Sequence, residues 1–284
     1  MTKYSPYTIK IFPLILFISL LFFSSCSFRP VSKSKNIIYS PKNNLSLNIF
    51  SPKQKHIKKP APVFLFIHGG SWRAGKKSTY NFLGKGMARK GAVAVIIDYR
   101  LYPRTNYEGM AIDAATAVKW VKQNIAGFGG DTNKIFVSGH SAGGQMAALI
   151  ATDNLYFDSL KIKNPITGTI LIDAFGLDMY SYFKNYRFNM EVYQSVFTKD
   201  QDNWKKGSPL YHLHKGMPPF LLFLGGKTNT NIIVGNNDFL AELKKYQPET
   251  AINIVPRKRH IGMIFSFYNS HKKEYRQIID FMEK

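Results

Sequence analysis

The stretch that organises this chain is Gly139-His140-Ser141-Ala142-Gly143-Gly144. It follows an apolar run at 134–138 and precedes a helix-forming run at 145–151. A serine on such a tight strand-to-helix turn is held in a strained backbone that points its hydroxyl out of the sheet, so the residues two before and two after it must be small. Strand, Gly-x-Ser-x-Gly and helix in this order form a nucleophile elbow. Alone, the six residues also fit a turn that happens to contain serine.

The sequence around this turn alternates between apolar runs and helical patterns. A strand with period-2 alternation is predicted at Leu45–Phe50. Further strands are predicted at 62–67, 92–97, 134–137, 169–172, 220–224 and 251–255, and helices at 79–90, 108–126, 145–151, 234–246 and 270–283. This alternation predicts an α/β fold, with a mostly parallel central sheet flanked by helices on both sides.

Composition limits the classes of protein to which the chain can belong. Its 284 residues, 45% of them hydrophobic, are enough for one large packed α/β domain. The single cysteine, Cys26, excludes a disulfide framework and a Cys-rich metal site. The net charge is +22, and sixteen Lys and Arg but no Asp or Glu precede Asp98. We find no nucleic-acid-binding motif, so we expect no nucleic-acid partner and interpret the charge as attraction to anionic lipid or as a solvated basic surface.

The N-terminus has the pattern of a targeting segment. Lys3 and Lys10 precede an apolar stretch at 11–23 that is short for a spanning helix, and Ser24-Ser25-Cys26 follows it. This resembles a bacterial lipoprotein signal peptide, which implies cleavage before Cys26 and lipidation of its thiol. Alternatives are an uncleaved anchor or ordinary secretion.

The expected organisation follows from this reading. Residues 1–25 are the signal peptide, 26–36 a basic tether and 37–284 the folded domain. The protein is then a membrane-anchored lipoprotein of the bacterial cell envelope that faces the periplasm or the exterior. Within the domain, the aromatic-rich stretch at 175–217 is expected to be a small cap inserted over the active-site edge; the alternative is ordinary packed helix.

Four motifs together carry a family resemblance. They are HGGSW at 68–72, DYRLYP at 98–103, GGD at 129–131 and GHSAGG at 139–144. Their order resembles that of α/β-hydrolase carboxylesterases with an HGGxW oxyanion motif, a group that includes arylformamidases and feruloyl and xylan-acetyl esterases. The resemblance covers the chain from about residue 37 to its end. It implies an α/β-hydrolase fold and hydrolysis of a small-molecule ester through an acyl-enzyme, with no metal or cofactor.

Acyl transfer requires a nucleophile and donors for the oxyanion that develops on the carbonyl. Ser141 is the candidate nucleophile. The N–H of Ala142, at the start of a helix, is one candidate oxyanion donor, and the Gly69-Gly70 turn is expected to supply the others. His68 is expected to brace this turn.

The candidate base lies after the last predicted strand. Of the seven histidines, only His260 closely follows the carboxyl end of this last strand, and the family places its catalytic histidine on this loop. His271 is the weaker candidate because it stands at the predicted start of a surface helix.

The candidate acid is where the sequence departs from the family pattern. Asn229 occupies the slot where the family has an aspartate, and asparagine cannot offset the charge of an imidazolium. Asp173, at the end of the preceding strand, is the first replacement, and Asp178 is the second. Asp238 is expected to face away on a helix. Alternatively, Asp173 is a structural carboxylate that caps a loop.

Two functional alternatives remain at this stage. An arylformamidase-type amide hydrolase would use the same residues on a different substrate. A non-catalytic binding lipoprotein with a hydrolase fold would explain Asn229. The sequence does not indicate an oligomeric state.

Overall fold

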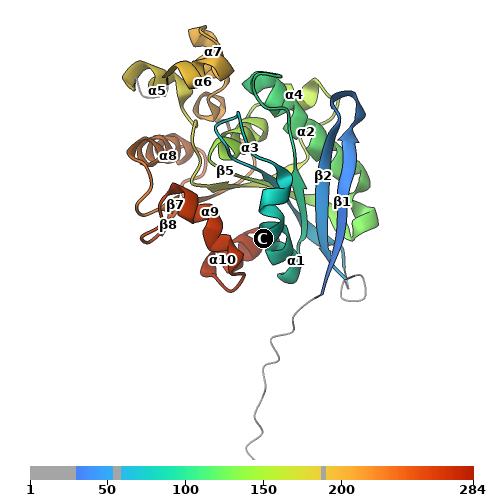
Figure 1. The fold of residues 1–284 in the computed structure, drawn as a ribbon. Helices are drawn as coiled ribbons and strands as arrows, with labels where there is room; N and C mark the ends of the chain where they lie inside the picture. The colour runs from blue at the N-terminus through green and yellow to red at the C-terminus, as the bar shows by residue number, and fades with distance from the viewer. Residues whose placement is uncertain (1–29, 54–58, 187–189) are drawn as a thin grey trace, which may run out of the picture.

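The computed structural model describes residues 30–53, 59–186 and 190–284, and these fold around an eight-stranded sheet (Figure 1). The strand order is β1-β2-β4-β3-β5-β6-β7-β8. The strands are β1 (Val31–Ser40), β2 (Leu45–Pro52), β3 (Ala61–Ile67), β4 (Val93–Ile97), β5 (Gly130–His140), β6 (Ile166–Ile172), β7 (Phe220–Gly225) and β8 (Ile252–Val255). β2 is antiparallel to both of its neighbours, and all pairs from β4 to β8 are parallel. The predicted α/β-hydrolase fold is confirmed.

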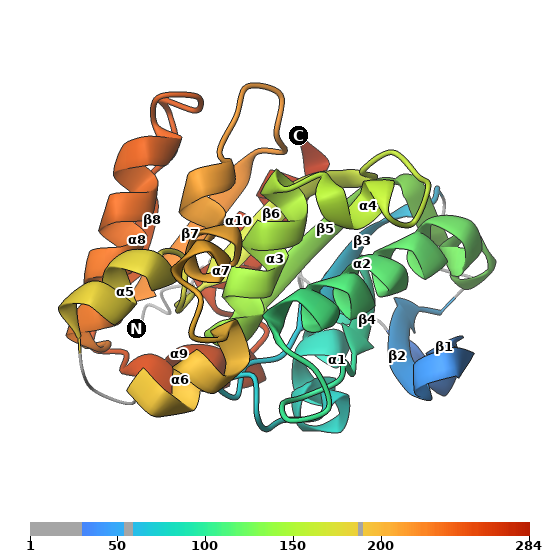
Figure 2. The same ribbon diagram turned by 90° about the horizontal axis from the view of Figure 1, so that it is seen from above.

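Helices cover both faces of this sheet (Figure 2). The main helices are α1 (Asn81–Arg89), α2 (Tyr107–Asn124), α3 (Ala142–Thr152), α8 (Thr230–Leu243), α9 (His260–Phe265) and α10 (Lys273–Glu283). Short ones are α4 (Leu155–Asp158), η1 (Pro41–Asn43), η3 (Lys77–Tyr80), η4 (Ile125–Phe128) and η6 (Ser266–Tyr268). One core lies between the sheet and α2, α3 and α8, and a second lies between the sheet and α1, α9 and α10.

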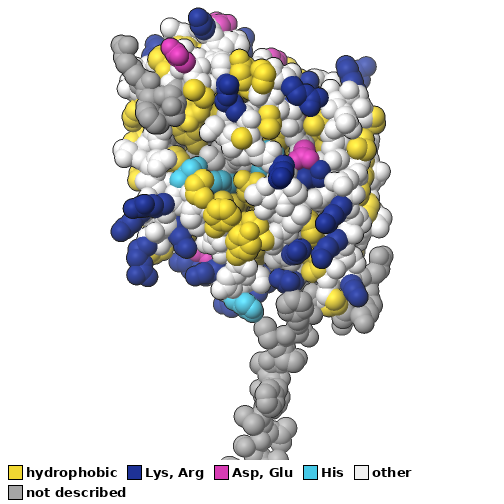
Figure 3. All heavy atoms as spheres, viewed as in Figure 1, with side chains coloured by type: hydrophobic (Ala, Val, Ile, Leu, Met, Phe, Trp, Pro, Cys, Tyr) yellow, Lys and Arg dark blue, Asp and Glu magenta, His cyan; other side chains and the backbone are white. Residues whose placement is uncertain are grey.

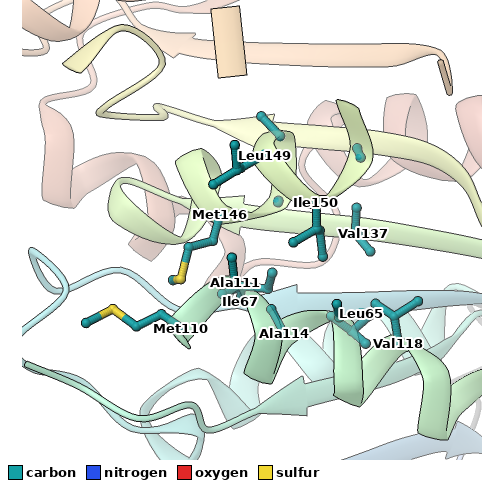
Figure 4. Packing of buried hydrophobic residues seen from close by; sticks show 14 of the residues in the cluster. Leu65, Ile67, Met110, Ala111, Ala114, Val118, Val137, Met146, Leu149 and Ile150 are labelled. Carbon is teal, nitrogen blue, oxygen red and sulfur yellow. The ribbon is translucent and has the colours of Figure 1, made fainter. Parts of the chain in front are cut away.

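The first of these cores holds the nucleophile strand and helix in place. Leu65, Ile67 and Val137 of the central strands pack against α2 and α3 (Figure 4). Met146, Leu149 and Ile150 come from α3, and Met110, Ala111, Ala114 and Val118 come from α2. All of these side chains are fully buried. Small alanines on α2 allow the helix to approach the strands closely. The tight packing of α2, α3 and the strands in this core holds the turn between β5 and α3 in place.

The expected tether at 26–36 is partly wrong. β1 begins at Val31 and pairs with β2 through an antiparallel register from Val31↔Pro52 to Ser40↔Leu45. Asn44, with φ 53°, closes the turn between them. β1 is an edge strand, and most of its residues before Tyr39 are exposed or half-buried, so its lysines and serines conceal the strand pattern in the sequence. The folded part therefore begins earlier than residue 37.

The described part of the stretch at 175–217 contains α5 (Met179–Asn185), α6 (Met190–Phe197), α7 (Gln201–Lys206) and η5 (Pro209–His212). It lies between β6 and β7 and packs against the loop after β3: the ring of Trp72 contacts Phe175, Tyr193 and Phe197. Aromatic residues of this segment thus pack together and against the loop after β3.

The expected signal peptide and Cys26 lie outside the described residues. Among the helices of the described ranges, none combines the length and the apolar character that a bilayer span requires.

Candidate active site

Ser141 sits in a strained turn between β5 and α3. Its φ of 56° and ψ of −126° are unfavourable for a residue with a side chain. A Cβ at position 139 would lie 2.0 Å from the carbonyl oxygen of Gly143, and one at position 143 would lie 2.1 Å from that of Ile67. Gly139 is therefore required by backbone contact across the turn, as the sequence predicted, whereas Gly143 is required by contact with the end of β3.

The C-terminal part of the chain brings a histidine to this serine. His260 is the first residue of α9, which follows β8. Its Nε2 lies 2.9 Å from Ser141 Oγ, and its Nδ1 lies 2.7 Å from Asp173 Oδ2. One imidazole thus connects a hydroxyl on one side with a carboxylate on the other.

Asp173 directly follows β6 and is fully buried. Besides facing His260, its carboxylate accepts a 2.7 Å hydrogen bond from the Gly225 amide and a 2.5 Å hydrogen bond from Thr228 Oγ1. Because buried carboxylates need partners, these donors explain how the side chain is kept in the interior beside the histidine. Its φ of 49° turns the chain sharply at the sheet edge.

The other candidate residues do not join this group. Asn229 precedes α8 and makes no side-chain cap hydrogen bond, and Asp238 is exposed on the same helix. Asp178 caps α5 by accepting a 2.9 Å hydrogen bond from the Ser181 amide. His271 is exposed, and its amide donates to Asn269 Oδ1. Of the weighed residues, the structure therefore brings Ser141, His260 and Asp173 together.

The loop after β3 lies directly against the serine. A Cβ at Gly69 would lie 2.7 Å from the His140 carbonyl oxygen and 3.0 Å from Ser141 Cβ. Gly70 has a φ of 128°, and a Cβ there would meet the Ala74 carbonyl oxygen at 2.1 Å. Ala142 is the first residue of α3, so its N–H has no carbonyl partner within the helix. Bare backbone thus approaches Ser141 from both loop and helix, as an oxyanion site requires.

Aromatic rings brace this loop. His68 is buried and stacks between Tyr80 and Tyr99, at ring centroid distances of 5.9 and 4.5 Å. The Tyr99 hydroxyl donates a 2.8 Å hydrogen bond to the His68 carbonyl oxygen. Burial lowers the pKa of His68, so its ring is neutral at neutral pH. The ring is too enclosed to act as a base and instead supports the loop.

A second set of contacts ties the loop to α3 and the segment above it. Trp72 Nε1 donates a 3.0 Å hydrogen bond to Gln145 Oε1, and Gln145 Nε2 donates a 2.8 Å hydrogen bond to the Gly207 carbonyl oxygen. Both hydrogen bonds join parts of the chain that are distant in sequence. The loop after β3 is consequently fixed to α3, the helix that follows Ser141.

His140 has a place in the site that the sequence reasoning missed. Its ring stacks on that of His260, and its Nε2–H donates a 3.1 Å hydrogen bond to the His260 carbonyl oxygen. Burial and then the charge of His260 lower the pKa of His140 to about 3. The only sequence signal was its position inside the elbow. Thr228 was also missed, although it lies within the segment that was searched for an acid.

Donor atoms of His140, Asp173 and His260 lie within 4.8 Å of one another, a spacing that a metal ion also accepts. In this site, however, His260 Nδ1 faces Asp173 and His140 Nε2 faces a backbone carbonyl. A cation would have to displace both hydrogen bonds. We therefore interpret these side chains as hydrogen-bond partners and not as metal ligands.

Comparison with known proteins agrees with this geometry. The family model BD-FAE matches residues 47–238, which is more than half of the chain. The chain belongs to the BD-FAE family. That match includes the oxyanion loop, the elbow and Asp173 but ends before His260.

Curated relatives of this BD-FAE member include named esterases from a plant. A probable isoprenylcysteine alpha-carbonyl methylesterase of Arabidopsis thaliana is 24% identical over 81% of this chain and 51% of its own length. The chain thus spans about half of that relative. A probable carboxylesterase 7 of the same plant is 28% identical over 88% of this chain and 86% of its own length.

Among solved structures, an inhibited esterase B from Lactobacillus rhamnosis superposes on this BD-FAE member with a TM-score of 0.73. The superposition covers 89% of this chain and 87% of that one at 17% sequence identity. At that identity the likeness supports the fold alone.

Proposed function

We propose that this protein is a serine hydrolase that cleaves carboxylic esters through an acyl-enzyme intermediate. The observation that carries the proposal is the continuous contact from Ser141 Oγ through His260 to Asp173. A nucleophile, a base and an orienting carboxylate in hydrogen-bond contact are the constellation that acyl transfer uses. Membership of the BD-FAE family and the esterase names of its relatives support an ester substrate.

In the proposed reaction, Ser141 Oγ attacks the ester carbonyl carbon while His260 Nε2 takes the hydroxyl proton. Negative charge develops on the carbonyl oxygen and is stabilised by amides of the Gly69-Gly70 turn and of Ala142. The intermediate collapses as His260 gives its proton to the departing alcohol, which leaves the acyl group on Ser141. A water molecule, deprotonated by His260, then releases the acid and restores the serine.

Asp173 is the proposed orienting acid. It accepts the Nδ1–H of His260, which leaves Nε2 unprotonated and directed at Ser141, and its charge stabilises the imidazolium that forms. Gly225 and Thr228 hold the carboxylate in that orientation. With Asp173 as the acid, Asn229 is not needed to orient the histidine. The asparagine was the reason for considering a non-catalytic binding protein, so we favour an enzyme.

The experiment is the variant Ser141→Ala, assayed with short p-nitrophenyl esters. We expect turnover to fall about a thousandfold or more, because the residual rate comes from binding and the oxyanion donors alone. The control is His271→Ala, which should keep wild-type activity. A fluorophosphonate probe should label the wild type and not Ser141→Ala. Unchanged turnover of that variant would contradict the proposal, and faster cleavage of formyl-aromatic amides than of esters would favour an arylformamidase.

We also propose, on the sequence alone, that Cys26 carries a lipid and holds the domain to a membrane of the bacterial cell envelope. Mass spectrometry of the mature protein tests this. Lipidation should add the mass of acyl chains to a fragment that begins at Cys26, and a mature chain that retains residues 1–25 would contradict it.

A further inference from the structure

A cluster of exposed apolar side chains lies beside His260. Ile261 and Phe265 are one helical turn apart on α9, and Tyr268 follows in η6; their exposed fractions are 58%, 46% and 63%. Phe82, which is half-buried at the start of α1, completes the cluster. We call these four residues the α9 patch. Large apolar side chains are expected singly on a surface, so a contiguous group of them indicates a contact surface.

The α9 patch is preorganised. The rings of Phe82 and Tyr268 stack with centroids 3.9 Å apart and planes 11° from parallel. Phe265 lies 6.3 Å from Phe82 and 5.8 Å from Tyr268, measured between ring centroids. Two segments distant in sequence therefore build one apolar surface with little rotamer freedom left to lose on contact.

The two chain segments that carry the patch hold charges of one sign. Residues 256–273 contain five Lys and Arg and no Asp or Glu, and residues 74–97 likewise contain five and none. These cations are Arg257, Lys258, Arg259, Lys272, Lys273, Lys76, Lys77, Lys85, Arg89 and Lys90. Lys77 is paired with Asp98, and the next acid in the chain after the first segment, Glu274, is buried. Figure 3 shows hydrophobic side chains gathered at the middle of this face with Lys and Arg on both sides.

We propose that the α9 patch docks on the surface of an anionic lipid bilayer. Exposed aliphatic and aromatic side chains suit the boundary between headgroups and acyl chains, and surrounding Lys and Arg are attracted to anionic headgroups. A single-stranded nucleic acid would also be attracted by the positive charge. Its bases, however, bind by stacking on exposed faces of aromatic rings, and the rings of Phe82 and Tyr268 stack on each other. Ile261 offers an aliphatic chain that bases do not stack on. His260 begins the same helix, so docking holds the candidate site at the lipid surface.

The proposal concerns adsorption and does not depend on the proposed function. Amide hydrogen exchange of the full chain gives a local readout that attachment through the N-terminus alone would not produce. The probes are vesicles of phosphatidylcholine and vesicles of equal parts phosphatidylcholine and phosphatidylglycerol. We expect exchange across 257–269 to slow about tenfold with the anionic vesicles only. Exchange around Leu155, which is 58% exposed elsewhere on the surface, should not change.

Two matched variants separate charge from apolar contact. Arg257→Gln/Lys272→Gln/Lys273→Gln and Ile261→Ser/Phe265→Ser should each remove most of the protection. The control Lys205→Gln/Lys206→Gln/Lys215→Gln removes the same number of charges from exposed positions outside the two segments and should keep the protection. The proposal is overturned by equal protection with neutral vesicles, by no protection with either, or by equal protection with a single-stranded oligonucleotide. Protection that rises with protein concentration in the absence of lipid would also overturn it, because a second copy would then cover the patch.

Discussion

The imidazole of His140 stacks on the imidazole of His260, with ring centroids 4.6 Å apart and planes 25° from parallel. His140 also donates from Nε2 to the His260 carbonyl oxygen, so it holds both the ring and the backbone of the candidate base. A protonated His140 would place a positive charge directly against the ring of His260 in a buried site. The site is therefore built around a neutral His140, and its protonation should oppose folding.

This sets the direction of a pH effect on stability. The pKa of His140 is lowered to about 3 in the folded protein, against about 6.5 in an unfolded chain. Between these values the unfolded state binds the additional proton, so stability is retained above pH 6.5 and lost as the pH falls. Replacing His140 with Gln should spare about 2 kcal/mol of that loss between pH 7 and pH 5, a difference measured by urea unfolding. His271→Gln should leave the pH dependence unchanged, and an equal slope in both variants would contradict the assignment.

The carboxylate beside His260 is tested by Asp173→Asn. An amide at this position can present an N–H to Nδ1 and favour the wrong imidazole tautomer, so we expect kcat to fall about a thousandfold or more. Asp238→Asn changes an exposed acid in the same part of the chain and should stay within about twofold of wild type. Steady-state kinetics on a p-nitrophenyl ester provide the comparison. The opposite ranking of the two variants would exclude Asp173 as the acid.

Close backbone approach at the oxyanion loop is tested by Gly69→Ala. The new methyl would lie 2.7 Å from the His140 carbonyl oxygen and must displace the loop or Ser141. We expect ester turnover to fall at least about tenfold and stability by about 1–3 kcal/mol, as overpacking usually costs. Gly127→Ala is the matched control, since a Cβ there meets nothing within 4 Å. Activity and melting temperature are measured for both, and similar values for the two variants would contradict the predicted contact.

Two ion pairs should differ in their contribution to stability. Asp113 is buried and receives Arg100 Nε at 2.8 Å and Arg100 Nη2 at 2.8 Å, beneath the motif at 98–103. Replacing Arg100 with Ala leaves a buried carboxylate without its cation and should cost about 3 kcal/mol of unfolding free energy. The exposed pair Lys245–Glu242 provides the control, and Lys245→Ala should change stability little. Chemical unfolding measures the loss of unfolding free energy in both variants. Comparable losses would contradict the larger contribution expected of the buried pair.

Local steric patterns in the sequence predicted much of this fold. The elbow could be found because Gly139 and Gly143 are imposed by contacts within a few residues and with the adjacent strand. The parallel strands were visible because they are buried on both faces and therefore apolar throughout. β1 was not predicted for the opposite reason: its exposed lysines hide a strand that, within the described part of the chain, pairs with β2 alone.

The acid required information that is not local. Asn229 occupies the family's usual slot, yet the carboxylate that meets His260 comes from the end of β6. That contact depends on β6 lying between β5 and β7, and on Thr228 and Gly225 of the next loop completing its hydrogen bonds. His140 lies within the elbow motif, but its role could not be predicted, because its contact with His260 arises only when residues 120 positions apart pack together.

The distance in sequence between Ser141 and His260 is 119 residues, and His260 comes after β8, the last strand of the sheet in chain order. During synthesis, the nucleophile, the oxyanion loop and Asp173 emerge long before β8 and α9. Native contacts of such long separation form only once the intervening chain has been made and folded. Ser141 therefore has no imidazole beside it until β8 and α9 are in place, so a nascent chain, or one truncated before residue 252, carries Ser141 and Asp173 without His260.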